Sequence, residues 1–395
     1  MNTFNELFDT EDYWSYDETR PKHEIAFLIS DQHFIPTGGI GQYALAFYRM
    51  CFKKRIRVHF ILDKAPSKEF HKLFDKAVFH YPDEPISYNI HSENFVHTDT
   101  MNMYKQANFF SAIMKAKKFL GKKDFSMYLC NTMESIIPAY SAGCAPLVIY
   151  THLYRQIHRD SDNGKFSEYF HKLVDNISNL PNVYIATQSL YNKKILKQHY
   201  PKVQILPIPF SDEQFLQRYD RENTKGVLFI GRCEEGKRYK KFLKICKEAE
   251  VPVKILTSKK SAIKFEQYCK DMGLEYDIRH SLVGKEKLDF ILSSALLLNV
   301  SKNESFSIST LECIGHMPVV TLDDQDWTEH FDKKFLTVCS KDKIVWTVKQ
   351  YHKRQWTIDF LPSTWYGNGS LDYVKAHQEY AYDVFDVFLE ETLGA

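Results

Sequence analysis

Short apolar runs alternate with longer amphipathic segments along most of this chain. The apolar runs lie at 24–30, 57–62, 126–129, 147–150, 183–187, 226–230, 253–256, 295–300 and 319–322. Segments with apolar residues at helical spacing lie at 42–52, 104–120, 165–177, 190–200, 239–249, 261–272, 288–292 and 371–391. Continuous apolar runs of this length are typical of strands that are buried on both faces. Their alternation with helical segments predicts parallel βαβ units and an α/β fold class.

The alternation occurs twice, and the proline-punctuated segment ILPIP at 205–209 separates the two series. A chain of 395 residues is also too long for one core of ordinary size. We therefore predict two Rossmann-like domains, at 1–208 and 209–370, with a ligand-binding cleft between them. The last segment, 371–395, is predicted to be a helix that packs back on the first domain. The acidic and aromatic first 22 residues are expected to be a surface extension.

Composition narrows the class of protein. A chain with 44% hydrophobic and 26% charged residues is typical of a soluble globular protein. The formal net charge of +2 gives no overall field that would attract nucleic acid or a membrane. Eight cysteines without a CxxC pair are expected to be reduced thiols of a cytoplasmic protein. We expect no secretory signal, because the first residues are acidic and aromatic rather than basic and then apolar. We expect no membrane span, because no apolar run approaches about 18 residues.

Polar residues of a few distinctive kinds follow several predicted strands. They are the glycine turn TGGIG at 37–41, the histidine His152, the cations Arg232 and Lys237, and the carboxylates Glu304 and Glu312. The carboxyl ends of parallel strands meet at one edge of a sheet, where ligands bind. Each feature alone also has a plain structural explanation, such as a tight turn, a structural histidine or a solvated helix face. Their combination indicates a ligand site more strongly than any one of them.

In the order of these features, and in the spacing of Arg232 and Lys237, the chain resembles the retaining glycosyltransferases of family four. That family has the GT-B fold, in which two Rossmann-like domains face each other across a donor and acceptor cleft. The resemblance is strong over 226–322. In the first domain it rests only on the glycine turn and His152.

The resemblance implies roles for individual residues. Arg232 and Lys237 match the pair that holds the diphosphate of a nucleotide-sugar donor, where negative charge grows as the sugar leaves. Glu312 matches the glutamate that binds the ribose hydroxyls, and Glu304 the one near the donor sugar, since a carboxylate accepts hydrogen bonds from neighbouring hydroxyls. His152 matches a histidine beside the donor sugar. The implied catalytic set is His152, Arg232, Lys237 and Glu304.

Further donor contacts are implied around this set. They are Gly38 and Gly39, Val283 near the base, and the backbone of Ser305, Phe306 and Ser307. The segment from Glu312 to Pro318 is one residue shorter than in the family, so the end of this helix is expected to differ. The donor is expected to be UDP-linked. The clamp of Arg232 and Lys237 makes a metal unnecessary, so we expect no metal and no cofactor, although Asp160–Asp162 and Asp324–Asp326 fit the DxD pattern of metal-dependent transferases.

The acceptor is less constrained. The segment 148–162 is similar to the corresponding region of T-even phage DNA α-glucosyltransferases, which implies 5-hydroxymethylcytosine in double-stranded phage DNA as the leading acceptor. Basic clusters at 53–57, 115–123 and 193–202 are candidates for a phosphate-binding groove, although solvated helix faces explain them as well. Two alternatives stay open: a transferase for a cell-surface polysaccharide or lipid-linked glycan, and a non-catalytic module that binds nucleotide-sugars or DNA.

Overall fold

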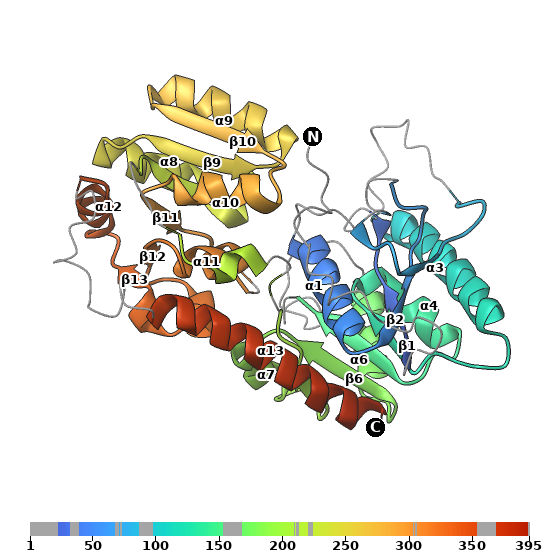
Figure 1. Ribbon diagram of the computed structural model, residues 1–395. Coiled ribbons are helices and arrows are strands. Elements are labelled where there is room, and N and C mark those ends of the chain that lie inside the picture. Colours follow the sequence, from blue (N-terminus) through green and yellow to red (C-terminus); the bar gives the residue numbers. More distant parts are fainter. Residues whose placement is uncertain are drawn as a thin grey trace.

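The chain forms two α/β units, each built on a parallel sheet, as a computed structural model shows (Figure 1). The structure describes residues 23–31, 39–67, 71, 73–86, 98–152, 168–208, 210, 213–219, 224–302, 304, 306–353 and 369–393. The predictions for the first 22 residues, Gly38, Asp160–Asp162 and Ser305 lie outside this range. The predicted fold class, two Rossmann-like α/β domains, is confirmed.

The first unit contains a seven-stranded sheet with the order β3-β2-β1-β4-β5-β6-β7, all of whose pairings are parallel. Its strands are β1 (His23–Leu28), β2 (Ile56–Ile61), β3 (Val78–His80), β4 (Met127–Cys130), β5 (Leu147–Thr151), β6 (Val183–Thr187) and β7 (Val203–Ile205). Its helices are α1 (Gly39–Lys53), α3 (Thr98–Leu120), η4 (Met133–Ser135), α4 (Ile136–Ser141), α6 (Glu168–Ser178) and α7 (Leu190–Leu196).

The second unit contains a six-stranded parallel sheet with the order β10-β9-β8-β11-β12-β13. Its strands are β8 (Val227–Ile230), β9 (Val253–Thr257), β10 (Tyr276–His280), β11 (Leu296–Asn299), β12 (Val319–Leu322) and β13 (Thr337–Cys339). Its helices are η5 (Glu213–Leu216), η6 (Glu235–Lys237), α8 (Tyr239–Ala249), α9 (Lys259–Met272), α10 (Gly284–Leu292), α11 (Ile308–Ile314), η7 (Asp326–His330), η8 (Lys333–Phe335) and α12 (Ile344–Lys353).

The apolar runs form the strands because helices cover them. Phe27 in β1 is fully buried, with its ring centroid 5.0 Å from that of Phe47 in α1 and 5.3 Å from that of Phe60 in β2. Full burial of one such side chain contributes roughly 1.5–3 kcal/mol. This packing fixes the strands firmly, so that the residues just beyond their carboxyl ends hold defined positions.

The last helix, α13 (Gly369–Leu393), runs along both units (Figure 1, red). Its Phe385 packs 5.6 Å from Phe47 of α1, and its Asp386 forms an ion pair with Lys54. Near its other end, Val374 packs against Gly315, which follows α11. The helix therefore connects the first domain to the part of the second domain that holds Glu312. Of the helices that the structure describes, none is long and apolar enough to cross a membrane.

Candidate functional site

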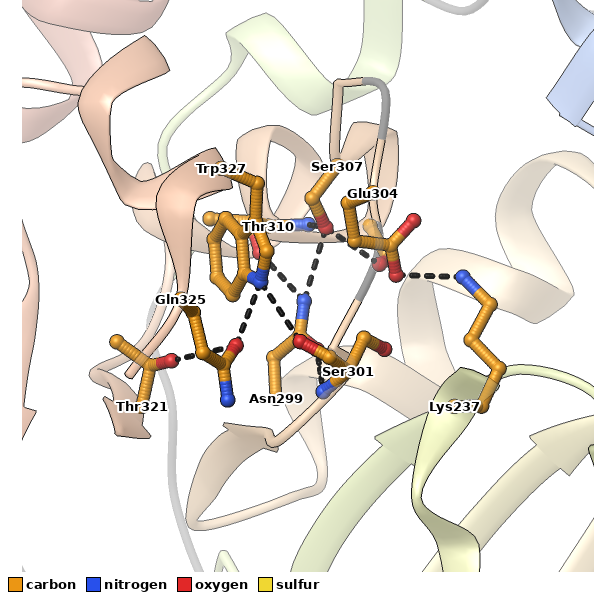
Figure 2. Close-up of polar contacts among 10 residues, drawn as sticks. Lys237, Asn299, Ser301, Glu304, Ser307, Thr310, Thr321, Gln325 and Trp327 are labelled. Carbon is orange, nitrogen blue, oxygen red and sulfur yellow. Dashed lines mark hydrogen bonds and ion pairs between the residues drawn. The ribbon is translucent and has the colours of Figure 1, made fainter. Parts of the chain in front are cut away.

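Lys237 and Glu304, which are 67 residues apart in the chain, form an ion pair beyond the carboxyl ends of β8 and β11 (Figure 2). Lys237 Nζ lies 2.5 Å from Glu304 Oε1. The two segments meet because the Lys302 backbone N–H donates to the Gly236 carbonyl over 2.9 Å, which ties the loop after β11 to η6. The structure thus brings together a predicted diphosphate cation and a predicted donor-sugar carboxylate.

The loop that carries Glu304 is held by a buried amide, Asn299, at the end of β11 (Figure 2). Its Nδ2 donates to Ser307 Oγ over 2.9 Å and to Thr310 Oγ1 over 3.1 Å, and its Oδ1 accepts the Ser301 N–H. Ser307 in turn caps α11, since its Oγ accepts the Thr310 N–H. Asn299 therefore positions this loop, and Ser307, predicted as a donor contact, has a structural role in the cap.

A second buried group supports the same loop from the other side. The indole Nε1–H of Trp327 donates to the Ser301 carbonyl over 2.9 Å and to Gln325 Oε1 over 2.5 Å, and Thr321 Oγ1 also donates to that oxygen. Trp327 is among the largest fully buried side chains of the described residues. Neither Trp327 nor Asn299 was singled out in the sequence, because a Trp or an Asn next to a strand has no distinctive spacing.

Phe306 points into the protein. Its ring lies 5.2 Å from that of Phe331, 5.8 Å from that of His330 and 5.4 Å from that of His377 on α13. Only the backbone of Phe306 remains available for a ligand, which is the part of this residue that the sequence pointed to.

Glu312 lies on α11 and pairs with a lysine that the sequence analysis missed. Lys287 Nζ of α10 lies 2.5 Å from Glu312 Oε1, and the two side chains are only 14% and 6% exposed. The same Nζ lies 5.6 Å from the centroid of the Phe215 ring. Val283, the predicted base contact, caps α10 one turn before Lys287. In the sequence, Lys287 is indicated only by its distance of four residues from Val283, a spacing that puts two residues on one side of a helix.

Arg232 forms an ion pair with a carboxylate close to it in the chain. Its side chain is 67% exposed, and its Nη1 lies 2.8 Å from Glu234 Oε1. The turn just after β8 is compact, since a Cβ built on Gly231 would lie 3.3 Å from the Phe229 ring. The guanidinium projects from this turn toward solvent and the carboxylate two residues further on. A role at a diphosphate therefore requires it to leave Glu234.

In the DxD triplet that the structure describes, Asp324–Asp326, the first carboxylate is paired with two cations. Arg238 Nη1 donates to Asp324 Oδ1 over 2.9 Å, and Lys341 Nζ lies 3.7 Å from the other oxygen. Burial opposes ionisation of Asp324, but the hydrogen bond and charge of Arg238 hold its pKa below the usual value. In the part of the chain that is described, no three His, Cys, Asp or Glu side chains are grouped to hold a metal ion.

His152 follows β5 and is held between residues that follow the two neighbouring strands. Its Nε2 lies 3.0 Å from Asn131 Oδ1 beyond β4, and its carbonyl accepts Gln188 Nε2 from beyond β6 over 2.6 Å. The Tyr43 ring of α1 lies 5.6 Å away, edge to face. Gly39 is the first residue of α1, and a Cβ built there would meet nothing within 4 Å.

Aromatic contacts join the His152 edge to the Glu304 loop across the two units. The ring of Tyr191, at the start of α7 just after Gln188, lies 5.4 Å from that of His330 in η7. His330 in turn contacts Phe306, two residues after Glu304. The predicted residues of both domains therefore belong to two facing, connected edges.

The basic clusters at 53–57, 115–123 and 193–202 lie elsewhere. They occupy the ends of α1, α3 and α7 and the turns that lead into β2, β4 and β7. Parallel strands all point the same way, so these turns lie at the edge of the sheet opposite to His152. Several of the cations are also paired, Lys54 with Asp386 and Lys115 with Asp83. These clusters therefore lie away from His152, and a phosphate-binding groove along them stays a prediction.

No model of a known protein family matches this sequence, and a search of curated proteins gives no match. Solved structures do match over nearly the whole chain. Anabaena HepE in complex with UDP and glucose is 14% identical, with a TM-score of 0.60 over 94% of this chain and 99% of HepE. Sucrose-phosphate synthase from Thermosynechococcus elongatus is 9% identical, with a TM-score of 0.67 over 95% of this chain and 100% of that one.

A third match is WaaG, a glycosyltransferase involved in lipopolysaccharide biosynthesis, which is 12% identical with a TM-score of 0.55 over 94% of this chain and 100% of WaaG. At such low identities the likeness concerns the fold. The chain has the GT-B fold, with two parallel-sheet domains of seven and six strands.

Proposed function

We propose that this protein is a glycosyltransferase that moves a hexose or pentose from a UDP-linked donor to an acceptor hydroxyl. The observation that carries the proposal is the placement of two lysine–glutamate pairs, Lys237–Glu304 and Lys287–Glu312, on one edge of the second sheet. One pair combines the cation and carboxylate that a diphosphate-linked sugar needs, and the other offers a carboxylate for a ribose diol. A similar fold is seen in HepE, whose structure holds UDP and glucose.

The chemistry follows from these groups. As the bond between sugar and diphosphate breaks, negative charge grows on the leaving diphosphate and must be stabilised in place. Lys237 supplies an ammonium with three donors, so that it can contact a phosphate oxygen and Glu304 together. Arg232, once released from Glu234, adds a planar fork that suits phosphate oxygens. Because this cationic pair can stabilise the leaving diphosphate, we expect transfer without a metal. We also expect the anomeric configuration to be retained, since the sequence resembles the retaining enzymes of family four.

Two acceptors are candidates. The first is 5-hydroxymethylcytosine in DNA, which rests on the similarity of 148–162 to phage enzymes. The second is the hydroxyl of a cell-surface glycan, and two observations favour it. The basic clusters lie at the sheet edge away from His152, and WaaG, which has a similar fold, acts in lipopolysaccharide biosynthesis. A cytoplasmic location stays a prediction for either acceptor.

The experiment that tests the function incubates the protein with radiolabelled UDP-glucose, UDP-galactose or UDP-N-acetylglucosamine. Each donor is combined in turn with hydroxymethylated DNA, unmodified DNA and lipopolysaccharide, with and without EDTA. Label on hydroxymethylated DNA alone would identify the first acceptor, and label on lipopolysaccharide alone would support the second. Loss of transfer in EDTA would contradict metal independence. If no donor is transferred or hydrolysed, the proposal fails and a non-catalytic binding module is favoured.

A further inference from the structure

The turn that carries Lys237 contains a residue in an unusual backbone conformation. Arg238, the next residue, joins η6 to α8 and lies in the left-handed region, with φ 48° and ψ 37°. Among the described residues other than glycine, only Arg55, Glu250 and Ser281 also have a positive φ. This conformation is disfavoured about 5- to 30-fold in a residue with a Cβ atom. The surrounding structure must therefore hold Arg238 in it.

An ion pair with Asp324 holds the side chain of Arg238. Its Nη1 donates to Asp324 Oδ1 over 2.9 Å, and the two side chains are only 20% and 29% exposed. Asp324 comes just after β12, where the neighbouring Asp323 N–H donates to the Cys339 carbonyl of β13 over 3.0 Å. The carboxylate is therefore fixed to the sheet. A charge-assisted hydrogen bond to it can offset the cost of the left-handed backbone.

The backbone of Arg238 determines where Lys237 points. Lys237 ends η6 and α8 begins directly after Arg238, so the left-handed residue changes the direction of the chain between them. In the right-handed conformation η6 would continue into α8 as one helix, and the residues before Arg238 would be rotated. That rotation would break the hydrogen bond from the Lys302 N–H to the Gly236 carbonyl, and with it the contact between Lys237 and Glu304 (Figure 2).

We propose that Arg238 and Asp324 are positioning residues, whose ion pair holds the left-handed turn that orients Lys237 toward the leaving diphosphate. The inference rests on the proposed function. It also gives the first carboxylate of the triplet Asp324–Asp326 a role other than metal binding. Lys341 Nζ, 3.7 Å from Asp324 Oδ2, is a second cation at this carboxylate. Neither Arg238 nor Asp324 needs to contact the donor for this role.

Arg238→Ala and Arg238→Gly are the decisive pair of variants. Both remove the guanidinium, but only glycine adopts the left-handed conformation without a steric cost. Arg238→Ala should bind UDP at least about 3-fold more weakly and release UDP from the donor more slowly, because fewer molecules then have the turn that orients Lys237. Arg238→Gly should keep both the affinity and the rate within about twofold of the wild type. If the guanidinium contacted the donor itself, the two variants would lose equally.

Asp324→Ala tests the other member of the ion pair. Alone, it should weaken UDP binding at least about 3-fold, as Arg238→Ala does. Added to Arg238→Gly it should have no further effect, since glycine keeps the turn without the ion pair. A carboxylate that bound a metal or the donor would be needed in both backgrounds. Calorimetry with UDP measures all these affinities.

Glu250, at the opposite end of α8, provides the matched control. It is also left-handed, with φ 56° and ψ 46°, and its exposed carboxylate accepts from Lys349 Nζ over 2.6 Å. Urea unfolding should show for both positions that the glycine variant is more stable than the alanine variant. Only at Arg238 should the two variants also differ in UDP affinity. The control separates the orientation of Lys237 from a general loss of stability.

Three results would overturn the inference. If the wild type binds UDP and the Arg238→Ala and Arg238→Gly variants bind it equally, the backbone of Arg238 does not orient Lys237. If Asp324→Ala weakens binding by the same factor in both backgrounds, Asp324 does not act through Arg238. If the wild type binds no UDP, the proposed function fails first and the positioning role fails with it.

Discussion

Lys237 and Glu304 are in direct contact, with 2.5 Å between Nζ and Oε1, although they come from different loops of the second domain. The contact places a cation and a carboxylate side by side. A sugar diphosphate presents the groups that these two bind, phosphate oxygens and hydroxyls. Glu304 orients the ammonium, and the ammonium balances the charge of the carboxylate. The pair is therefore a preformed element of the donor site in our account.

Replacing Lys237 by methionine removes the positive charge of the ammonium and nearly keeps the length of the side chain. The loss of one preorganised electrostatic contact to the leaving diphosphate costs about 2.7–4 kcal/mol of transition-state stabilisation. We expect kcat to fall about 100- to 1,000-fold in an assay of UDP release. Lys240 belongs to the same basic run of the sequence but lies on α8. Lys240→Met is therefore the matched control and should keep the wild-type rate. A Lys237→Met enzyme with near-normal kcat would remove this residue from the mechanism.

Lys287 is expected to act on the donor through Glu312. Lys287→Met leaves a carboxylate buried without its cation, and breaking such a pair destabilises a protein by about 3–5 kcal/mol. The UDP affinity should fall at least about 10-fold, because Glu312 loses its orientation toward the ribose. The double variant Lys287→Met/Glu312→Gln removes the unpaired charge, so it should regain stability and still bind UDP weakly. Urea unfolding and calorimetry with UDP measure the two effects, and full UDP affinity in the double variant would refute the role.

Arg232 and Glu234 form an exposed pair, which contributes only about 0–1 kcal/mol to stability. Arg232→Ala should therefore leave the melting temperature almost unchanged. Its kcat should fall by the factor that corresponds to a loss of about 2–4 kcal/mol in transition-state stabilisation. Glu234→Gln should release the guanidinium and leave kcat within about twofold of the wild type, with equal or tighter UDP binding. Rates of Arg232→Ala close to wild type would show that the arginine is a surface residue only.

Stability should fall in mild acid because of a buried histidine pair in the first domain. His59 Nδ1 lies 3.0 Å from His80 Nε2. Burial lowers the pKa of His59 from 6.5 to about 3 and that of His80 from 6.5 to about 4. The unfolded chain therefore takes up protons below pH 6.5 that the folded chain does not, and stability is lost as pH falls from 6.5 toward 4.

At pH 5 the loss is roughly 2 kcal/mol for each histidine. Urea unfolding at pH 7.5 and pH 5 measures it. A His59→Gln/His80→Gln variant should show a smaller loss between the two pH values, whereas His280→Gln, at the exposed end of β10, should behave like the wild type. An equal loss in the double variant and the wild type would contradict this explanation.

Most of the second domain could be predicted from its periodicity. The helix at Tyr239–Ala249 and the strand at Val319–Leu322 have the predicted bounds, because both bury a clear apolar face. The strand Tyr276–His280 was missed, since it lies at the edge of the sheet and is mostly half-buried or exposed. An edge strand carries polar residues that conceal the pattern on which prediction depends.

The candidate site was predictable only in part. Glu304 and Lys237 were identified and are in contact, because both follow strands of one parallel sheet. Lys287 was missed, since a lysine on an amphipathic helix resembles a solvated charge until the fold brings a buried carboxylate beside it. The position of the basic clusters was not predictable either, because charge density along the chain does not reveal at which edge of a sheet a turn lies.

In the proposed function, the carboxyl edge of the second sheet binds a nucleotide-sugar donor. A calorimetric titration of the wild type and of Glu312→Gln with UDP tests this binding directly. We expect UDP to bind at one site per chain in the wild type and at least about 10-fold more weakly in Glu312→Gln, because a charged hydrogen-bond partner is lost. Absence of UDP binding in the wild type, or equal binding by both proteins, would contradict it.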